Sequence, residues 1–112
     1  MQVHHSNEND YHIIAVKGDV DASSSIVLDS ALEKAIHEKH PNILIDCSEL
    51  SYISSPGIGV FTSRLDDCET VHIKLVLFAM SDKVLNVFRI LGLDQLIQIV
   101  QTKEEAKLAI LK

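Results

Sequence analysis

The chain has 112 residues, enough for one globular domain with a core of its own but too few for two. Apolar residues make up 46% and charged residues 23%, which excludes a disordered chain. The net charge is −6 and no Lys/Arg run with interleaved aromatics occurs, so we expect no nucleic-acid partner and favour a partner with a basic patch. We therefore expect a single domain over residues 1–112.

Two further exclusions concern the membrane and the thiols. No apolar run approaches the roughly eighteen residues of a membrane span, and the N-terminus MQVHHSNEND lacks a signal-peptide core. We therefore expect a cytoplasmic protein. Cys47 and Cys68 are isolated, lie in apolar surroundings and form no C-x-x-C pair, so we expect two reduced core thiols.

The N-terminal part of the chain predicts two strands. Val3 lies in a short edge strand, and residues 6–10 form a polar turn. Residues 11–16 (YHIIAV) form a strand because β-branched and aromatic residues dominate, and this strand ends at Gly18. Residues 18–21 (GDVD) are then predicted as a turn.

A helix and a buried strand come next. Apolar residues recur at helical spacing over residues 24–39, and His40 ends the helix because it precedes Pro41. Residues 43–45 (ILI) form a continuous apolar run, typical of a strand buried on both faces. Residues 50–53 lead the chain into its most informative segment.

That segment is ISSPGIG at residues 53–59. Serine is a favoured N-cap and proline suits the first helical turn, so we predict that Ser55 caps a helix and Pro56 opens it. Gly57 and Gly59 leave the first turn nearly bare, which allows another backbone, a protein or a phosphate to come close. The positive end of the helix dipole tolerates added negative charge. Ser55 is thus either a phosphorylatable serine or an ordinary N-cap.

The rest of the chain alternates helices and strands. One apolar helix face comprises Ile58, Phe61, Leu65 and Cys68. A buried strand over residues 74–80 is followed by a helix capped by Ser81 and Asp82 and ended by Gly92. The buried face of that helix is predicted as Val84, Phe88 and Leu91. Residues 96–100 form a short strand, and Thr102 and Glu105 have the capping-box spacing that opens a last helix.

This order predicts an α/β fold with a mixed, mostly parallel sheet of about five strands and about four helices. The first two strands, joined by a short turn, add an antiparallel pair at one side.

Most enzyme classes are excluded by the absence of their motifs. No G-x-G-x-x-G, P-loop or G-x-S-x-G occurs, and the scattered histidines are expected at the surface. One alternative draws Asp19, Asp21 and Asp46 together as a Mg²⁺-binding phosphoacceptor, as in response-regulator receivers. Lys83 is the only loose match to a receiver's lysine. We otherwise expect no metal, no cofactor and no catalytic activity.

Residues 46–60 (DCSELSYISSPGIGV) resemble the D-L-S-x-V-x-x-I-D-S-S-G-L-G-V signature of STAS domains, and more narrowly of bacterial anti-sigma factor antagonists. Residues 18–21 resemble the family's G-E-L-D turn. Residues 76–81 and 84–93 resemble its strand and following helix, which ends in an L-G-L-type corner. The resemblance covers nearly the whole chain with the same element order.

The resemblance implies a switch. In this family the unphosphorylated protein binds an anti-sigma factor, often a serine kinase of the histidine-kinase-like ATPase type, and frees the sigma factor for transcription. The kinase inactivates the antagonist by phosphorylating a serine, and a PP2C-type phosphatase reverses this. Carried onto this chain, the acceptor is Ser55, and Asp21 is the turn aspartate near it. The implied partner-binding residues are Asp21, Ser54, Ser55, Pro56, Gly57, Ile58 and Gly59.

Two departures from the family pattern matter. Ser54 stands where the family usually has Asp, so Ser54 is a competing acceptor. Pro56 replaces the usual second small residue and stiffens the turn. Some STAS domains are not phosphorylated and serve as lipid-transporter subunits or sensory scaffolds, so the alternative is a constitutive binding module.

Overall fold

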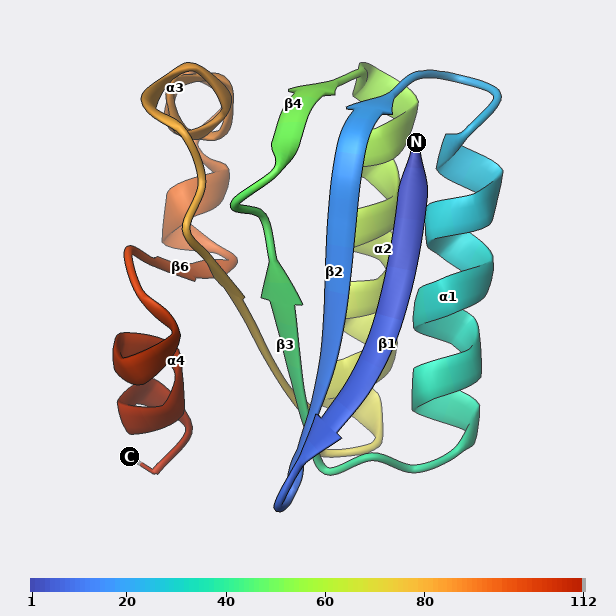
Figure 1. Cartoon of the computed structure of the whole chain (residues 1–112), viewed down its shortest axis with the longest axis vertical. Helices are drawn as coiled ribbons and strands as arrows, with labels where there is room; N and C mark the ends of the chain where they lie inside the picture. The colour runs from blue at the N-terminus through green and yellow to red at the C-terminus, as the bar shows by residue number, and fades with distance from the viewer. Residues whose placement is uncertain (112) are drawn as a thin grey trace.

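The computed structural model describes residues 1–111 and has an α/β fold (Figure 1). The strands are β1 (Gln2–Glu8), β2 (Tyr11–Val20), β3 (Asn42–Asp46), β4 (Leu50–Ile53), β5 (Lys74–Phe78) and β6 (Gln98–Val100). The helices are α1 (Ser25–His37), α2 (Ser55–Thr70), α3 (Asp82–Ile90), the short 3-10 helix η1 (Leu93–Gln95) and α4 (Lys103–Ile110). No helix within the described range is long and apolar enough to cross a membrane.

The sheet is mixed and mostly parallel. Its strand order is β1-β2-β3-β5-β6, and β4 also pairs with β2. β1 is antiparallel to β2, whereas the other pairings are parallel. The predicted mainly parallel sheet with an antiparallel pair at one side is therefore confirmed, with one strand more than expected.

The additional strand is β4, which shares β2 with β3. β3 pairs with β2 as far as Ala15, the chain then loops away, and β4 returns to pair with residues 18–20 of β2. The register shifts between Gly18 and Asp19, and Gly18 has a φ of +88°. The turn predicted over residues 18–21 is therefore wrong for residues 18–20, which belong to β2. Gly18 marks a bulge inside a long strand, because glycine tolerates this backbone conformation at no steric cost.

The N-terminal hairpin also differs from the prediction. Residues 6–8 belong to β1, where they pair with residues 11–13 of β2. The turn is confined to Asn9 and Asp10, and Asn9 has a φ of +55°. β1 is an edge strand whose side chains are mostly exposed, so polar residues are accommodated in it. The polar side chains at residues 6–8 were therefore mistaken for a turn.

Helices cover both faces of the sheet. Ile43 and Ile45 belong to the main core, to which α1, α2 and α3 contribute, whereas Leu44 belongs to a second core with α4. This alternation confirms that β3 is buried on both faces. Cys47 and Cys68 are buried free thiols of the main core, as predicted.

The later helices begin as predicted. The Ser81 hydroxyl accepts a hydrogen bond from the Val84 N–H at 3.3 Å, and the Thr102 hydroxyl accepts one from the Glu105 N–H at 3.1 Å. Val84 and Phe88 are buried, but Leu91 is 57% exposed, so its predicted burial is wrong. Leu91 follows the last residue of α3, where the chain turns away at Gly92 with a φ of +73°.

Three histidines form a cluster that links β1, β2 and the loop after α1. Nδ1 of His5 lies 2.9 Å from Nε2 of His12, and the rings of His12 and His40 stack with centroids 4.1 Å apart. His12 is only 4% exposed, so the expectation of surface histidines is wrong there. Residues two apart on a strand lie on the same face, so His12 shares a face with the fully buried Ile14. This alternation could have revealed the burial of His12.

Gly57 fits where the first turn of α2 crosses the ends of two strands. A Cβ added at this position would lie 2.8 Å from Cγ1 of Ile53 on β4 and 2.8 Å from Cγ1 of Val20 on β2. Among residues 1–111, apart from the adjoining residues and backbone of α2 itself, no atom lies within 4 Å of a Cβ added at Gly59. The close approach that Gly57 permits is therefore between α2 and the sheet.

Gly57→Ala and Gly59→Ala form a matched pair of substitutions on the same helix. Gly57→Ala should destabilise the fold by about 1–3 kcal/mol because the new methyl overpacks the contact with Val20 and Ile53. Gly59→Ala should leave stability unchanged or raise it by up to about 1 kcal/mol, since alanine favours the helix. Urea denaturation of both variants measures the difference. Equal stability of the two would contradict this packing.

Acid should destabilise the protein through His12. Burial, together with the charges of His40 and His5, lowers the pKa of His12 from 6.5 to about 4. Between these values the unfolded chain binds a proton that the folded protein does not, so stability is present above pH 6.5 and falls towards pH 4.

We expect the urea midpoint to fall between pH 7 and pH 5, and to fall less in His12→Gln. An equal fall in the variant would show that other groups cause the acid sensitivity.

Candidate functional site

The candidate site lies where β2 and β4 end side by side. Val20 and Ile53 are paired, and the Ser54 N–H donates a hydrogen bond to the Val20 carbonyl at 2.8 Å. Each strand then leads into a helix at the same end of the sheet (Figure 1). The turn containing Asp21 and the turn containing Ser55 are therefore neighbours, although they are far apart in sequence.

Ser54, not Ser55, is the N-cap of α2. The Ser54 backbone is extended, and its hydroxyl accepts a hydrogen bond from the Gly57 N–H at 3.4 Å. The Ser54 carbonyl also accepts the Ile58 N–H at 3.0 Å. Ser55 is the first helical residue and Pro56 the second. The prediction was displaced by one residue because Pro fits both of the first two helical positions, whose N–H groups have no partner within the helix.

The residues of the first α2 turn divide into an outer and an inner set. Ser55, Pro56 and Gly59 are exposed, whereas Gly57 and Ile58 are buried. Within residues 1–111 the Ser55 hydroxyl makes no hydrogen bond, while that of the half-buried Ser54 is engaged in the cap. A partner or a modifying enzyme therefore has access to Ser55, Pro56 and Gly59.

Asp21 is exposed but held by hydrogen bonds at the start of α1. Its Oδ1 accepts the Ser24 N–H at 2.8 Å and the hydroxyls of Ser23 and Ser24, each at 2.9 Å. These hydrogen bonds lower the pKa of Asp21 to about 2, and the bond from the Ser24 backbone N–H has the largest effect. Asp21 is thus a fixed negative charge beside the turn that carries Ser55.

The other acidic residues do not join Asp21 in a metal centre. Asp46 lies at the end of β3, where its Oδ1 accepts the Ser48 N–H at 2.9 Å, and Asp19 is exposed on β2. Within the described part of the chain, no group of three His, Cys, Asp or Glu side chains is arranged to hold a metal ion.

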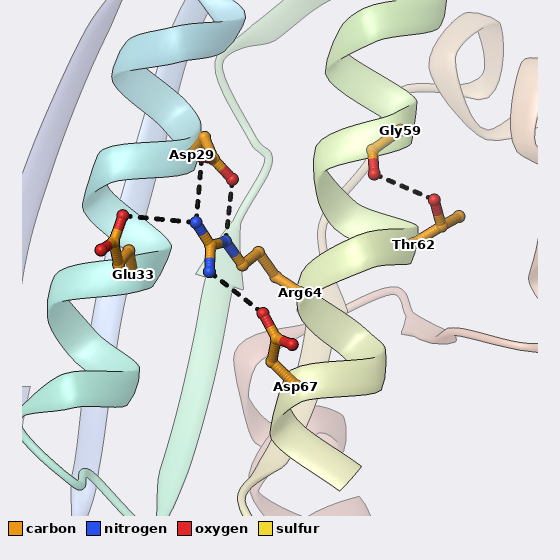
Figure 2. Close-up of polar contacts among 6 residues, drawn as sticks. All are labelled: Asp29, Glu33, Gly59, Thr62, Arg64 and Asp67. Carbon is orange, nitrogen blue, oxygen red and sulfur yellow. Dashed lines mark hydrogen bonds and ion pairs between the residues drawn. The ribbon is translucent and has the colours of Figure 1, made fainter. Parts of the chain in front are cut away.

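An ionic cluster ties together the two helices that start at this site (Figure 2). Arg64 on α2 donates from Nε to Oδ1 of Asp29 at 2.8 Å and from Nη2 to Oδ2 of Asp29 at 3.0 Å. It also contacts Glu33 on α1, at 3.3 Å, and Asp67 on α2, at 3.0 Å. The bidentate pair lowers the pKa of Asp29 and fixes how α1 lies against α2.

Sequence reasoning missed exposed apolar residues on the elements around the site. Ile26 and Val27 in the first turn of α1 are 68% and 52% exposed, and Tyr52 on β4 is 47% exposed. A signal was present for α1, because residues 26–28 are three consecutive apolar residues and a helix cannot turn all three towards one core. For Tyr52 no such signal existed, since β4 itself was not recognised as a strand.

Comparison with known proteins places this geometry in a family. A family model described as STAS domain matches residues 2–106. The anti-sigma-B factor antagonist of Listeria monocytogenes is 33% identical over 98 residues, which cover 88% of this chain and 86% of that protein.

Solved structures with little sequence identity share the fold. An anti-sigma factor antagonist from Mycobacterium paratuberculosis matches with a TM-score of 0.91 at 16% identity, over 99% of this chain and 94% of that one. The Bacillus cell fate determinant SpoIIAA in its phosphorylated form matches with a TM-score of 0.73 at 22% identity, over 97% and 99% of the two chains. By its sequence and its fold, the chain belongs to the STAS domain family.

Proposed function

We propose that this chain is an anti-sigma factor antagonist that acts by binding a partner protein, not by catalysis. The relative from Listeria monocytogenes, which matches 88% of this chain, is named anti-sigma-B factor antagonist. The proposed partner is an anti-sigma factor that is also a serine kinase of the histidine-kinase-like ATPase type. Its capture would release a sigma factor in the cytoplasm and so regulate transcription.

We further propose that phosphorylation of Ser55 ends this binding. The observation that carries the proposal is the difference between two adjacent serines at the start of α2. The Ser54 hydroxyl caps the helix, whereas the exposed Ser55 hydroxyl has no hydrogen bond within residues 1–111. A structural neighbour, SpoIIAA, has been solved in a phosphorylated form.

Electrostatics explain how a phosphate could release the partner without unfolding the protein. A phosphoserine adds about −1.5 to −2 charge. The N-terminus of α2 tolerates this charge, because the helix dipole is positive there. The sequence of the first α2 turn, SPGI, contains neither an acidic nor a basic residue, and the neighbouring Asp21 is already ionised. The added charge would therefore increase the negative potential at this turn and repel a partner whose contacting face there is acidic.

The proposed binding surface contains Asp21 and the exposed part of the α2 turn. Ser55, Pro56 and Gly59 would contact the partner, while Ser54, Gly57 and Ile58 would act by shaping the turn. A PP2C-type phosphatase would remove the phosphate from the exposed serine and restore binding.

Substitution of Ser55 tests the switch. The kinase is first captured from the native cells with the parent protein. We expect Ser55→Asp to weaken binding to this kinase by at least about tenfold, because the added carboxylate would repel an acidic face of the kinase at this turn. Ser55→Asn has a similar shape without the charge and should bind like the parent. Calorimetric titration of the purified pair measures both affinities. Equal affinities of the Asp and Asn variants would rule out the electrostatic mechanism.

Incubation with the same kinase and ATP separates the two serines. Phosphate should be taken up by Ser54→Ala, which loses only its helix cap, but not by Ser55→Ala. If only the Ser55→Ala variant took up phosphate, the switch serine would be Ser54. If no variant is phosphorylated and all bind equally, the chain is a constitutive binding module.

A further inference from the structure

A cavity lies at the opposite end of the molecule from Ser55. It has a volume of about 560 Å³ and is bordered by the C-terminal ends of α1 and α2 and by the segments that lead from them to β3 and β5. In Figure 1 these helix ends lie together, away from the turns at which α1 and α2 begin. Its lining residues are Ile36, His37, Lys39, Pro41, Val71, His72 and Ile73.

The lining combines an apolar wall with basic groups. Four of its residues are aliphatic or proline, and the ionisable ones are His37, Lys39 and His72. Within residues 1–111 no acidic residue lines the cavity, although the chain carries 16 Asp and Glu residues against 10 Lys and Arg. The nearby carboxylate of Glu38 pairs with His40, with Oε1 3.2 Å from Nε2. The cavity therefore favours a ligand that has both an apolar body and a negative charge.

Two of the basic residues adopt a backbone conformation that usually requires glycine. Lys39 and His72 each have a φ of +62°, just beyond the ends of α1 and α2. Glycine is the common residue at this position of a helix end, because other residues lose stability there. Both strained residues border the same cavity and both are basic. The fold thus keeps two basic residues at positions where glycine would be more stable.

We propose that this cavity binds a small soluble carboxylate with an aliphatic body. The aliphatic part would pack against Ile36, Pro41, Val71 and Ile73, and the carboxylate would face Lys39 and His72. The cavity is spatially separate from Ser55, because it lies at the other ends of α1 and α2. Its ligand class follows from the charge and shape of the lining.

Octanoate and octanamide test the proposal, because they share a chain length and differ in charge. We expect octanoate, titrated into the full chain at pH 7, to shift the amide NMR signals of residues 36–41 and 71–73 saturably. Octanamide should bind at least about threefold more weakly, as expected for one partly exposed ion pair. Lys39→Gly should lose that preference for the carboxylate and melt at a higher temperature than the parent, since glycine relieves the strain.

Two control variants separate strain from charge. Asn9→Gly relieves a positive φ of +55° in the hairpin turn and should leave octanoate affinity unchanged. Lys83→Gln removes an exposed cation on α3 and should also bind octanoate like the parent. The proposal is overturned if octanoate shifts no signal at this cavity, if octanamide binds equally well, or if Lys39→Gly retains the parent's affinity for octanoate.

Discussion

The parallel pairing of β4 with the end of β2 is the constraint on which the site depends. β4 has only four residues. It pairs with β2 beyond the point where the pairing of β3 with β2 ends, and the bulge at Gly18 accommodates this change of partner. The hydrogen bond from the Ser54 N–H to the Val20 carbonyl extends this pairing to the start of α2. Because α1 and α2 both begin at these strand ends, the turn with Asp21 and the turn with Ser55 become neighbours.

In the α2 turn beside this pairing, adjacent residues differ in whether they pack against the sheet or face solvent. Gly57 and Ile58 face inwards and let α2 pack closely on Val20 and Ile53, whereas Ser55 and Pro56 face outwards. The contacts of Arg64 with Asp29 and Glu33 fix the two helices further along (Figure 2). A charge added at Ser55 would therefore change the electrostatic potential of the surface that a partner contacts, while the fold stays intact.

The sequence predicted the fold well where one strong local signal existed. Continuous apolar runs revealed β3 and β5, and the serine and threonine caps revealed α3 and α4. It failed where a long-range contact decides the structure. β4 is a strand only because β2 offers it an edge, and His12 is buried because His5 and His40 cover it. The N-cap was misplaced because Ser54 and Ser55 are chemically alike, and only the backbone conformation distinguishes them.

Peptide mass spectrometry of the protein purified from its native cells, under growing and stressed conditions, tests the central claim most directly. The account predicts a single phosphate on Ser55 whose occupancy changes with the condition. It also predicts no phosphate on Ser54, whose hydroxyl caps α2. A phosphate confined to Ser54, or no phosphate on Ser55 in any condition, would contradict the claim that Ser55 is the switch.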